Sequence, residues 1–140
     1  MKLDSIHVAI GVVVTGFVWF LGGVTGLTLA VLLAIIFDYV LAVFVAIDKG
    51  RKAKASFLNS QTGFKGIVKK VIMVMCLGFS HWLDMCLMAN SPIFKSAFSV
   101  LFLGNESISL TKHLKYFGVP IPQVFIDSST KWTDSVKKGG

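Results

Sequence analysis

The sequence predicts an all-α, polytopic integral membrane protein with about four transmembrane helices and both termini in the cytoplasm. Of the 140 residues, 54% are hydrophobic and only 15% are charged. A soluble domain of this size could not cover so much apolar surface with so few charges. Four apolar runs of near membrane-spanning length follow one another, and basic residues gather beside them.

The first two runs, residues 6–21 and 27–47, are expected to form a helical hairpin. A glycine-rich turn, residues 22–26, separates them. The first run is too long for the core of a secretory leader, and no Ala-x-Ala-like cleavage site follows it. We therefore expect it to remain in the protein as a transmembrane helix.

The last two helices are expected at residues 67–88 and 93–110. A polar, basic, cytoplasmic loop, residues 48–66, precedes them. The fourth run is strictly apolar only to about Leu103, which is short of the roughly 20 residues that a span needs. It crosses the bilayer if Lys95 snorkels at one end and Glu106 is tolerated near the other. Residues 1–118 then form a transmembrane domain, and residues 119–140 a basic cytoplasmic tail.

The basic residues orient these helices. Half of the fourteen Lys and Arg residues lie within residues 49–70, and five more lie within residues 112–138. With four crossings, both clusters and the N-terminus share one side, which the positive-inside rule places in the cytoplasm. With three crossings, the basic tail would lie on the wrong side. Basic clusters that flank apolar spans indicate membrane orientation and contact with anionic lipids, and no nucleic-acid partner is expected.

The tail itself allows two interpretations. Pro120 and Pro122 prevent a helix from running through its start. Beyond them, Phe125, Trp132 and Val136 recur at helical spacing. A short interfacial helix against anionic lipid and a disordered tail both remain open.

Three acidic residues, Asp38, Asp84 and Glu106, lie in or at the end of separate apolar runs. A charged side chain at the centre of a bilayer costs roughly 2.5–3.5 kcal/mol on insertion scales. Partner helices, water or copies of the same chain must therefore shield these acids. They indicate a function inside the membrane.

The surroundings of each acid suggest oligomerisation or pore residues. Asp38 stands in a row of small residues at four-residue intervals, a spacing that permits close helix approach or reflects the frequency of alanine. His81 and Asp84 share a helix face and would form a proton-sensitive or a structural pair. Glu106 belongs to a polar stripe that would face water inside an oligomer, or the acid would be solvated at the cytoplasmic headgroups.

The candidate oligomerisation or pore residues are Ala30, Ala34, Asp38, Ala42, Ala46, His81, Asp84, Ser99, Glu106 and Ser109. The stripe also includes Lys95 and His113.

Catalytic and metal-binding patterns are not evident. Cys76 and Cys86 stand ten residues apart in one apolar run, without a Cys-x-x-Cys spacing. The His81 and Asp84 spacing alone defines neither a catalytic triad nor a metal site. We expect no enzymatic activity, no cofactor and no metal.

Five short motifs occur in a recognisable order. They are Phe37-Asp38-Tyr39, Ser60…Gly63-Phe64-Lys65-Gly66…Lys69-Lys70, His81-x-x-Asp84, Asn105-Glu106-x-x-Ser109 and Gly118-x-Pro120-x-Pro122. From about residue 36 to residue 125 the chain resembles phage holin family 4, the toxin-secretion and phage-lysis holins. Ala42 replaces a frequent glycine of that pattern. Lys112-His113 replaces Glu-Asn and reverses a charge, which puts in doubt any role carried over to that position.

The resemblance implies a non-enzymatic phage protein that forms homo-oligomers in the bacterial cytoplasmic membrane. Such proteins accumulate and then open lethal lesions at a set time, so that a cytoplasmic endolysin reaches the cell wall. The endolysin is a functional partner, and no direct contact between the two proteins is expected. Some relatives release toxins instead. The alternatives are a small ion or proton channel or carrier subunit, which would conduct selectively, and a structural or chaperone-like membrane protein, which would not change permeability.

Overall fold

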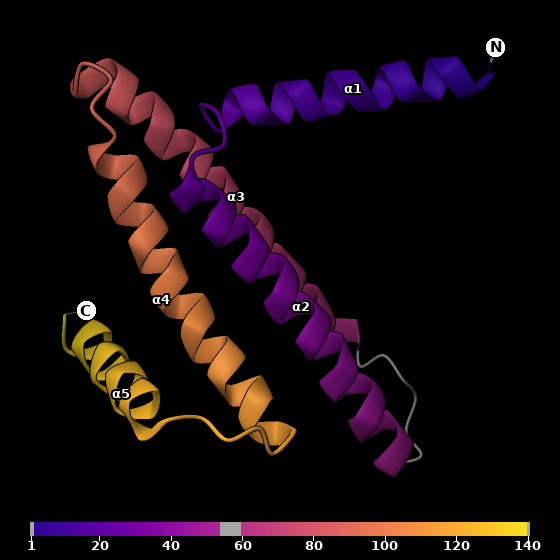
Figure 1. Cartoon of the computed structure of the whole chain (residues 1–140), viewed down its shortest axis with the longest axis vertical. Helices are drawn as coiled ribbons and strands as arrows, with labels where there is room; N and C mark the ends of the chain where they lie inside the picture. Colours follow the sequence, from indigo (N-terminus) through magenta and orange to yellow (C-terminus); the bar gives the residue numbers. More distant parts are fainter. Residues whose placement is uncertain (1, 54–59, 140) are drawn as a thin grey trace.

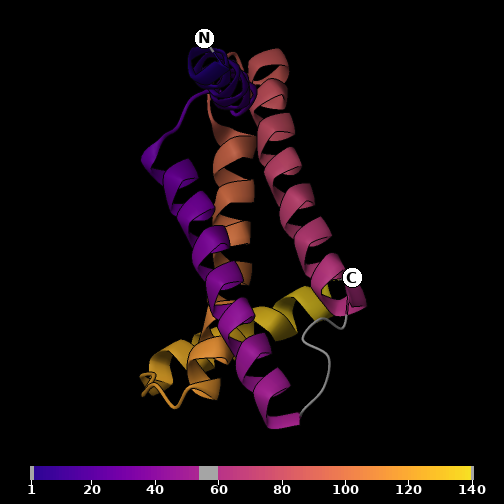
Figure 2. The ribbon, with the colours of Figure 1, turned by 90° about the vertical axis from the view of Figure 1, so that its right-hand side faces the viewer.

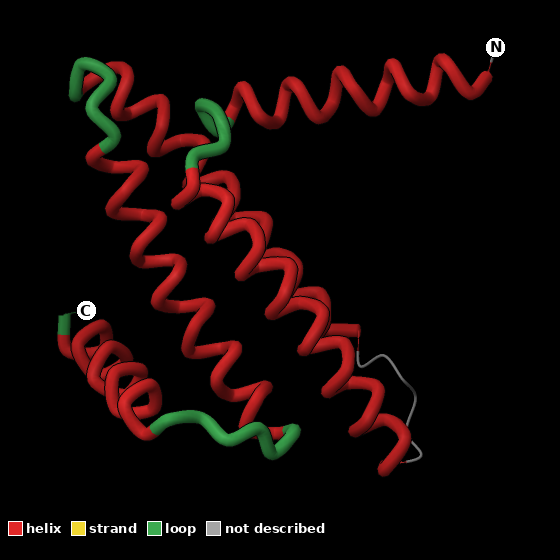
Figure 3. The backbone as a smooth tube through the Cα atoms, in the orientation of Figure 1, coloured by secondary structure: helices red, strands yellow, loops and turns green. Residues whose placement is uncertain are grey.

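The computed structural model describes residues 2–53 and 60–139, and all regular secondary structure in this part is α-helical. The helices are α1 (Lys2–Phe20), α2 (Gly26–Ala53), α3 (Ser60–Leu87), α4 (Ile93–Tyr116) and α5 (Gln123–Lys138). Helices α2, α3 and α4 run down, up and down again as an antiparallel bundle (Figures 1 and 2), with α1 at one end and α5 at the other. Figure 3 shows the loops that join α1 to α2, α3 to α4 and α4 to α5. The expected all-α class is confirmed.

Two helices have the length and composition of membrane spans within the described residues. These are Gly26–Arg51 in α2 and Phe64–Leu87 in α3. The apolar part of α1, Asp4–Phe20, is shorter. Large apolar side chains such as Leu33, Phe37 and Phe79 point outward and are more than half exposed. An apolar exterior of this extent is typical of a protein surrounded by lipid.

Each helix of the bundle contributes one buried row of side chains, which we call its seam. The buried positions follow one another at alternating spacings of three and four residues, the pattern of helices that pack as in a coiled coil. The seams comprise Thr28, Val31, Ile35, Asp38 and Val45 in α2, Met73, Leu77, Ser80 and Asp84 in α3, and Lys95, Ser99, Phe102 and Glu106 in α4.

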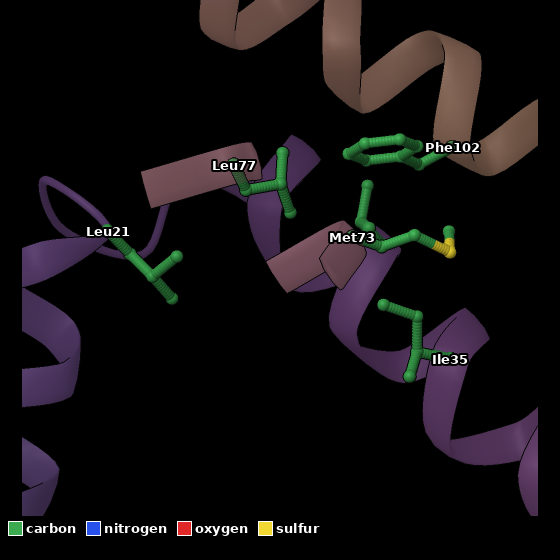
Figure 4. Packing of buried hydrophobic residues seen from close by; sticks show 6 residues of the cluster. Leu21, Ile35, Met73, Leu77 and Phe102 are labelled. Atoms are coloured by element: carbon green, nitrogen blue, oxygen red, sulfur yellow. The ribbon is translucent and has the colours of Figure 1, made fainter. Parts of the chain in front are cut away.

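The apolar core occupies the middle of these seams. Figure 4 shows Ile35, Met73, Leu77 and Phe102 packed between the three helices, with Leu21 at the edge of the cluster. Polar and charged seam residues lie on both sides of this core along the helices. The bundle is therefore apolar outside and at its centre, and polar inside toward both ends.

Helix α1 does not form the expected hairpin with α2. It lies across the end of the bundle, away from its long axis (Figure 1). Gly22 and Gly23 form the turn with φ of 66° and 81°, values that glycine adopts at little cost. The Phe20 ring packs onto Gly78 of α3. These contacts fix the turn against α3 and direct the rest of α1 outward.

Helices α2 and α3 extend into residues 48–66, which were expected to form a basic loop. Helix α2 continues to Ala53 and α3 begins at Ser60, while residues 54–59 lie outside the described part. A change from apolar to polar residues predicts where a helix leaves the membrane, but it does not predict where the helix ends. In the tail, α5 forms after Pro122, so the helical interpretation is the one observed.

Substituting valine for Gly78 is expected to release α1 from the bundle. A Cβ atom at this position would overlap the Phe20 ring. We expect a loss of about 1–3 kcal/mol in the free energy of unfolding, the usual cost of overpacking. Denaturation in detergent micelles, followed by circular dichroism, measures it. Gly66→Val is the matched control, because nothing lies near the corresponding position there; equal losses in both variants would contradict the packing described.

Candidate functional site

One charged cluster joins all three helices of the bundle. The Lys70 ammonium group of α3 donates a hydrogen bond of 2.7 Å to Oδ2 of Asp38 in α2. The same group also donates to Oε2 of Glu106 in α4. Both carboxylates are buried, with exposed side-chain fractions of 5% and 0%. A single lysine thus bridges acids from the two other helices.

Neighbouring side chains extend this cluster. His113 Nδ1 lies 3.1 Å from the second carboxylate oxygen of Asp38. The Asn105 amide donates to Oε1 of Glu106 at 3.1 Å, and its own oxygen accepts a hydrogen bond of 3.2 Å from Lys69. We call Asp38, Lys70, Glu106 and His113 the charged cluster.

The charged cluster ties the helices together through strong contacts whose loss is costly. Two carboxylates face one ammonium group, so the cluster is one positive charge short of neutrality when His113 is neutral. A proton on His113 or on either acid would balance it. Removing one member of a buried ion pair typically costs 3–5 kcal/mol, because the remaining charge stays buried without a partner.

A second polar group lies at the opposite end of the bundle. Asp84 of α3 accepts hydrogen bonds from the backbone N–H groups of Phe94 and Lys95, at 2.7 and 2.8 Å. N–H groups in the first turn of a helix have no carbonyl partner within that helix, and the helix dipole also favours a negative charge there. The Lys95 ammonium group donates to the carbonyl oxygens of Gly22 and Gly23. Asp84 and Lys95, the capping cluster, therefore join α3, α4 and the α1–α2 turn.

The expected pairing of His81 with Asp84 is not observed. Both carboxylate oxygens of Asp84 accept hydrogen bonds from α4. His81 instead lies against Gly22 and makes an edge contact with the Trp82 ring, at 5.7 Å between centroids. Sharing a helix face places two side chains near each other, but the start of α4 offers Asp84 the stronger partners.

The alanine row crosses the seam of α2 only at its centre. Asp38 is buried, whereas Ala30, Ala34 and Ala42 are partly buried and Ala46 is exposed. Positions four residues apart turn by about 40° per step around a helix, so a long row leaves any straight interface at its ends. Within one chain, the seam follows the alternating spacing of three and four residues instead.

The polar stripe of α4 faces the inside of the bundle. Glu106 is completely buried against Lys70, which differs from a solvated position at the headgroups. The buried Ser99 hydroxyl donates to the Lys95 carbonyl oxygen at 2.7 Å, and Ser109 is half-buried. Partner helices therefore shield this stripe within the single chain.

Sequence reasoning missed that Lys70 bridges two of the acids and that the Lys95 ammonium group binds the α1–α2 turn. Lys70 was expected at a membrane edge and Lys95 as a snorkelling residue. The seam spacing contained the missing signal: Lys70 stands three residues before Met73 and seven before Leu77, so it continues the seam of α3. Among the described residues, no group of three or more His, Cys, Asp or Glu side chains is arranged to hold a metal ion.

Comparison with known proteins identifies the family. Residues 15–132 match the Bacteriophage holin family. The chain belongs to this family.

The curated relatives include a holin-like protein. The chain is 30% identical to the holin-like protein TcdE of Clostridioides difficile, an alignment that covers 74% of each chain. It is 32% identical to an uncharacterised protein of Clostridium perfringens, with 84% of each chain covered. No solved structure gives a significant match. Membership of this holin family supports a holin-type function in a membrane and points to a non-enzymatic protein.

Replacing Lys70 with methionine is expected to destabilise the bundle by about 3–5 kcal/mol, because two buried carboxylates lose their shared cation. Titration with sodium dodecyl sulfate in mixed micelles, followed by circular dichroism, measures the change. Lys65→Met is the control, since Lys65 is exposed. Adding Asp38→Asn and Glu106→Gln to Lys70→Met should recover much of the loss. No recovery would contradict a cost that arises from unpaired charge.

Proposed function

We propose that this holin-family protein oligomerises in the bacterial cytoplasmic membrane and forms timed lethal lesions that release an endolysin to the cell wall. The observation that carries the proposal is the set of buried charges between the helices of a chain that belongs to the holin family. The endolysin is a functional partner, and passage through the lesion requires no direct contact with the holin.

The charged cluster gives the single chain a closed form. Its acids and lysine satisfy one another inside the bundle, so the surface that meets lipid stays apolar. When many copies gather, the same acids and lysines can pair between chains as well as within one. Helices that exchange partners in this way would turn their polar seams toward a shared, water-filled space.

The energetics suit a delayed and abrupt event. Packing and polar contacts between helices in lipid contribute about 0.6–2 kcal/mol each. An oligomer held by many such contacts forms steeply with concentration, while a few copies remain separate. The alanine row around Asp38 is the proposed surface for close approach between neighbouring chains.

Proton uptake is the proposed trigger for this exchange. The charged cluster lacks one positive charge when His113 is neutral, and a proton on any of its acids would weaken the bridge through Lys70. Loss of the membrane potential changes the field that acts on buried charges. Uncouplers should therefore advance opening.

We further propose that all of α1 to α4 cross the bilayer, with the basic end of the bundle and both termini in the cytoplasm. The basic ends of α2, α3 and α4 lie together, which agrees with the positive-inside rule. Helix α4 can cross because Lys95 and Glu106 are buried in the bundle, while the exposed Lys112 and Lys115 lie near its basic end. Helix α1 lies across the end of the bundle in the single chain, so it must turn parallel to the bundle in order to cross. Residues 8–20 are apolar apart from Thr15, whereas a helix that rests on a membrane surface needs a polar face.

A small ion or proton channel or carrier subunit is the second candidate. The buried acids of α2, α3 and α4 favour it, since intramembrane carboxylates also serve as proton relays. Release of a toxin through a holin-type lesion is a variant of the first proposal.

Induction of this chain together with a signal-less endolysin is expected to give a delayed, abrupt loss of turbidity and membrane potential. Omitting either protein should abolish lysis, and an uncoupler should advance it. Gradual potential loss without lysis would favour the channel, and no effect on either signal would leave a structural role.

Lys70→Met should shift the onset of lysis earlier at equal expression, whereas Lys65→Met should not. The proton hypothesis fails if Asp38→Asn, Glu106→Gln and His113→Gln all leave lysis timing and the uncoupler response unchanged.

Topology can be read from cysteine labelling in whole cells. In a chain with Cys76→Ala and Cys86→Ala, a cysteine in place of Ser5 should react with a membrane-impermeant maleimide only after permeabilisation. Lys137→Cys, in the tail, is the cytoplasmic control. Labelling of the Ser5 position in intact cells would show that α1 does not cross and that the bundle spans the membrane with α2, α3 and α4 alone.

A further inference from the structure

An apolar groove lies between the last turns of α2 and the end of α4. It has a volume of about 390 Å³. Its apolar lining comprises Leu41, Phe44, Ile47, Leu114, Phe117 and Val119. Asp48 and Arg51 complete the lining. We call this the α2–α4 groove; it is separate from the charged cluster.

We propose that the α2–α4 groove binds one acyl chain of an anionic glycerophospholipid from the cytoplasmic leaflet, with the headgroup phosphate at Arg51. This proposal depends on the membrane location and orientation proposed above. It does not depend on lesion formation or lysis.

The length of the groove matches one leaflet of a bilayer. Leu41 and Arg51 are ten residues apart on α2, which corresponds to about 15 Å along a helix. Half of a hydrocarbon core is also about 15 Å thick. With Arg51 at the headgroup level, the apolar lining therefore extends to about the bilayer centre, as an acyl chain does.

The charge at the mouth of the groove favours a phosphate. Arg51 is exposed and has no ion pair among the residues that the structure describes, and its guanidinium group can donate two parallel hydrogen bonds to phosphate oxygens. Asp48 already accepts a hydrogen bond of 2.8 Å from the Tyr116 hydroxyl. Lys49 lies over the same Tyr116 ring, at 5.3 Å from its centroid, and adds a positive charge beside Tyr116.

A second groove at the same end of the bundle has similar chemistry. On α3 it is lined by the apolar residues Phe64, Val68, Ile72 and Met73 together with Lys65 and Lys69. Both grooves thus combine an apolar channel with basic side chains at the basic end of the chain. This repetition supports an anionic lipid over a neutral one as the natural occupant.

Native mass spectrometry of the full chain in detergent tests the proposal. Phosphatidylglycerol and phosphatidylcholine with identical acyl chains are the probes. We expect phosphatidylglycerol to bind about fivefold more tightly, the ratio expected for one basic side chain at an anionic surface. In a chain with Lys65→Gln and Lys69→Gln, which removes the basic side chains of the second groove, Arg51→Gln should reduce this preference to less than twofold. Lys137→Gln in the same background, on exposed α5, should retain it. Val119→Trp should fill the groove and weaken binding of both lipids.

Two outcomes would overturn the proposal. One is a preference for phosphatidylglycerol that survives Arg51→Gln, or that falls equally in Lys137→Gln, since the charge would then act diffusely. The other is unchanged lipid binding in Val119→Trp, which would show that the groove holds another occupant, such as detergent or a second copy of the chain. Neither readout requires lysis, so failure here and failure of the holin proposal remain distinguishable.

Discussion

The bridge from Lys70 to Asp38 and Glu106 is the interaction on which the arrangement of α2, α3 and α4 depends. In a bilayer, moving an apolar side chain from lipid into the bundle releases little free energy, because lipid tails are as apolar as a leucine side chain. Apolar contacts therefore cannot decide which face of each helix turns inward. Buried charges can, because exposing one to lipid is expensive. The cation of α3 thus sets the rotation of all three helices.

Much of the fold followed from the sequence because the bilayer makes simple demands. The apolar runs predicted the helices, and the glycines at residues 22–23 and Pro92 marked the turns around α2 and α4. Helix ends were harder to predict, since α2 and α3 continue into polar sequence. The direction of α1 depends on the contact of Phe20 with Gly78, which joins distant parts of the chain and leaves no local pattern.

The acids were also identifiable from the sequence, but their partners were not. A carboxylate in an apolar run is unusual wherever it lies, so Asp38, Asp84 and Glu106 stood out. Lys70 did not, because lysine near a membrane edge is ordinary and its burial becomes evident only when it is aligned with the seam of α3. For Asp84 the sequence suggested the wrong partner. His81 shares its helix face, whereas the observed partners are backbone N–H groups of α4.

The two polar clusters differ in how readily they can change partners. Asp84 accepts hydrogen bonds from backbone N–H groups of a helix start, and Lys95 donates to backbone carbonyl oxygens. Such partners are backbone groups that the fold itself holds in place. The charged cluster consists of side chains that another copy of the chain could replace and that a proton could neutralise. If the bundle opens, it would therefore separate first at its basic end, while the capping cluster keeps α3 and α4 joined at the other.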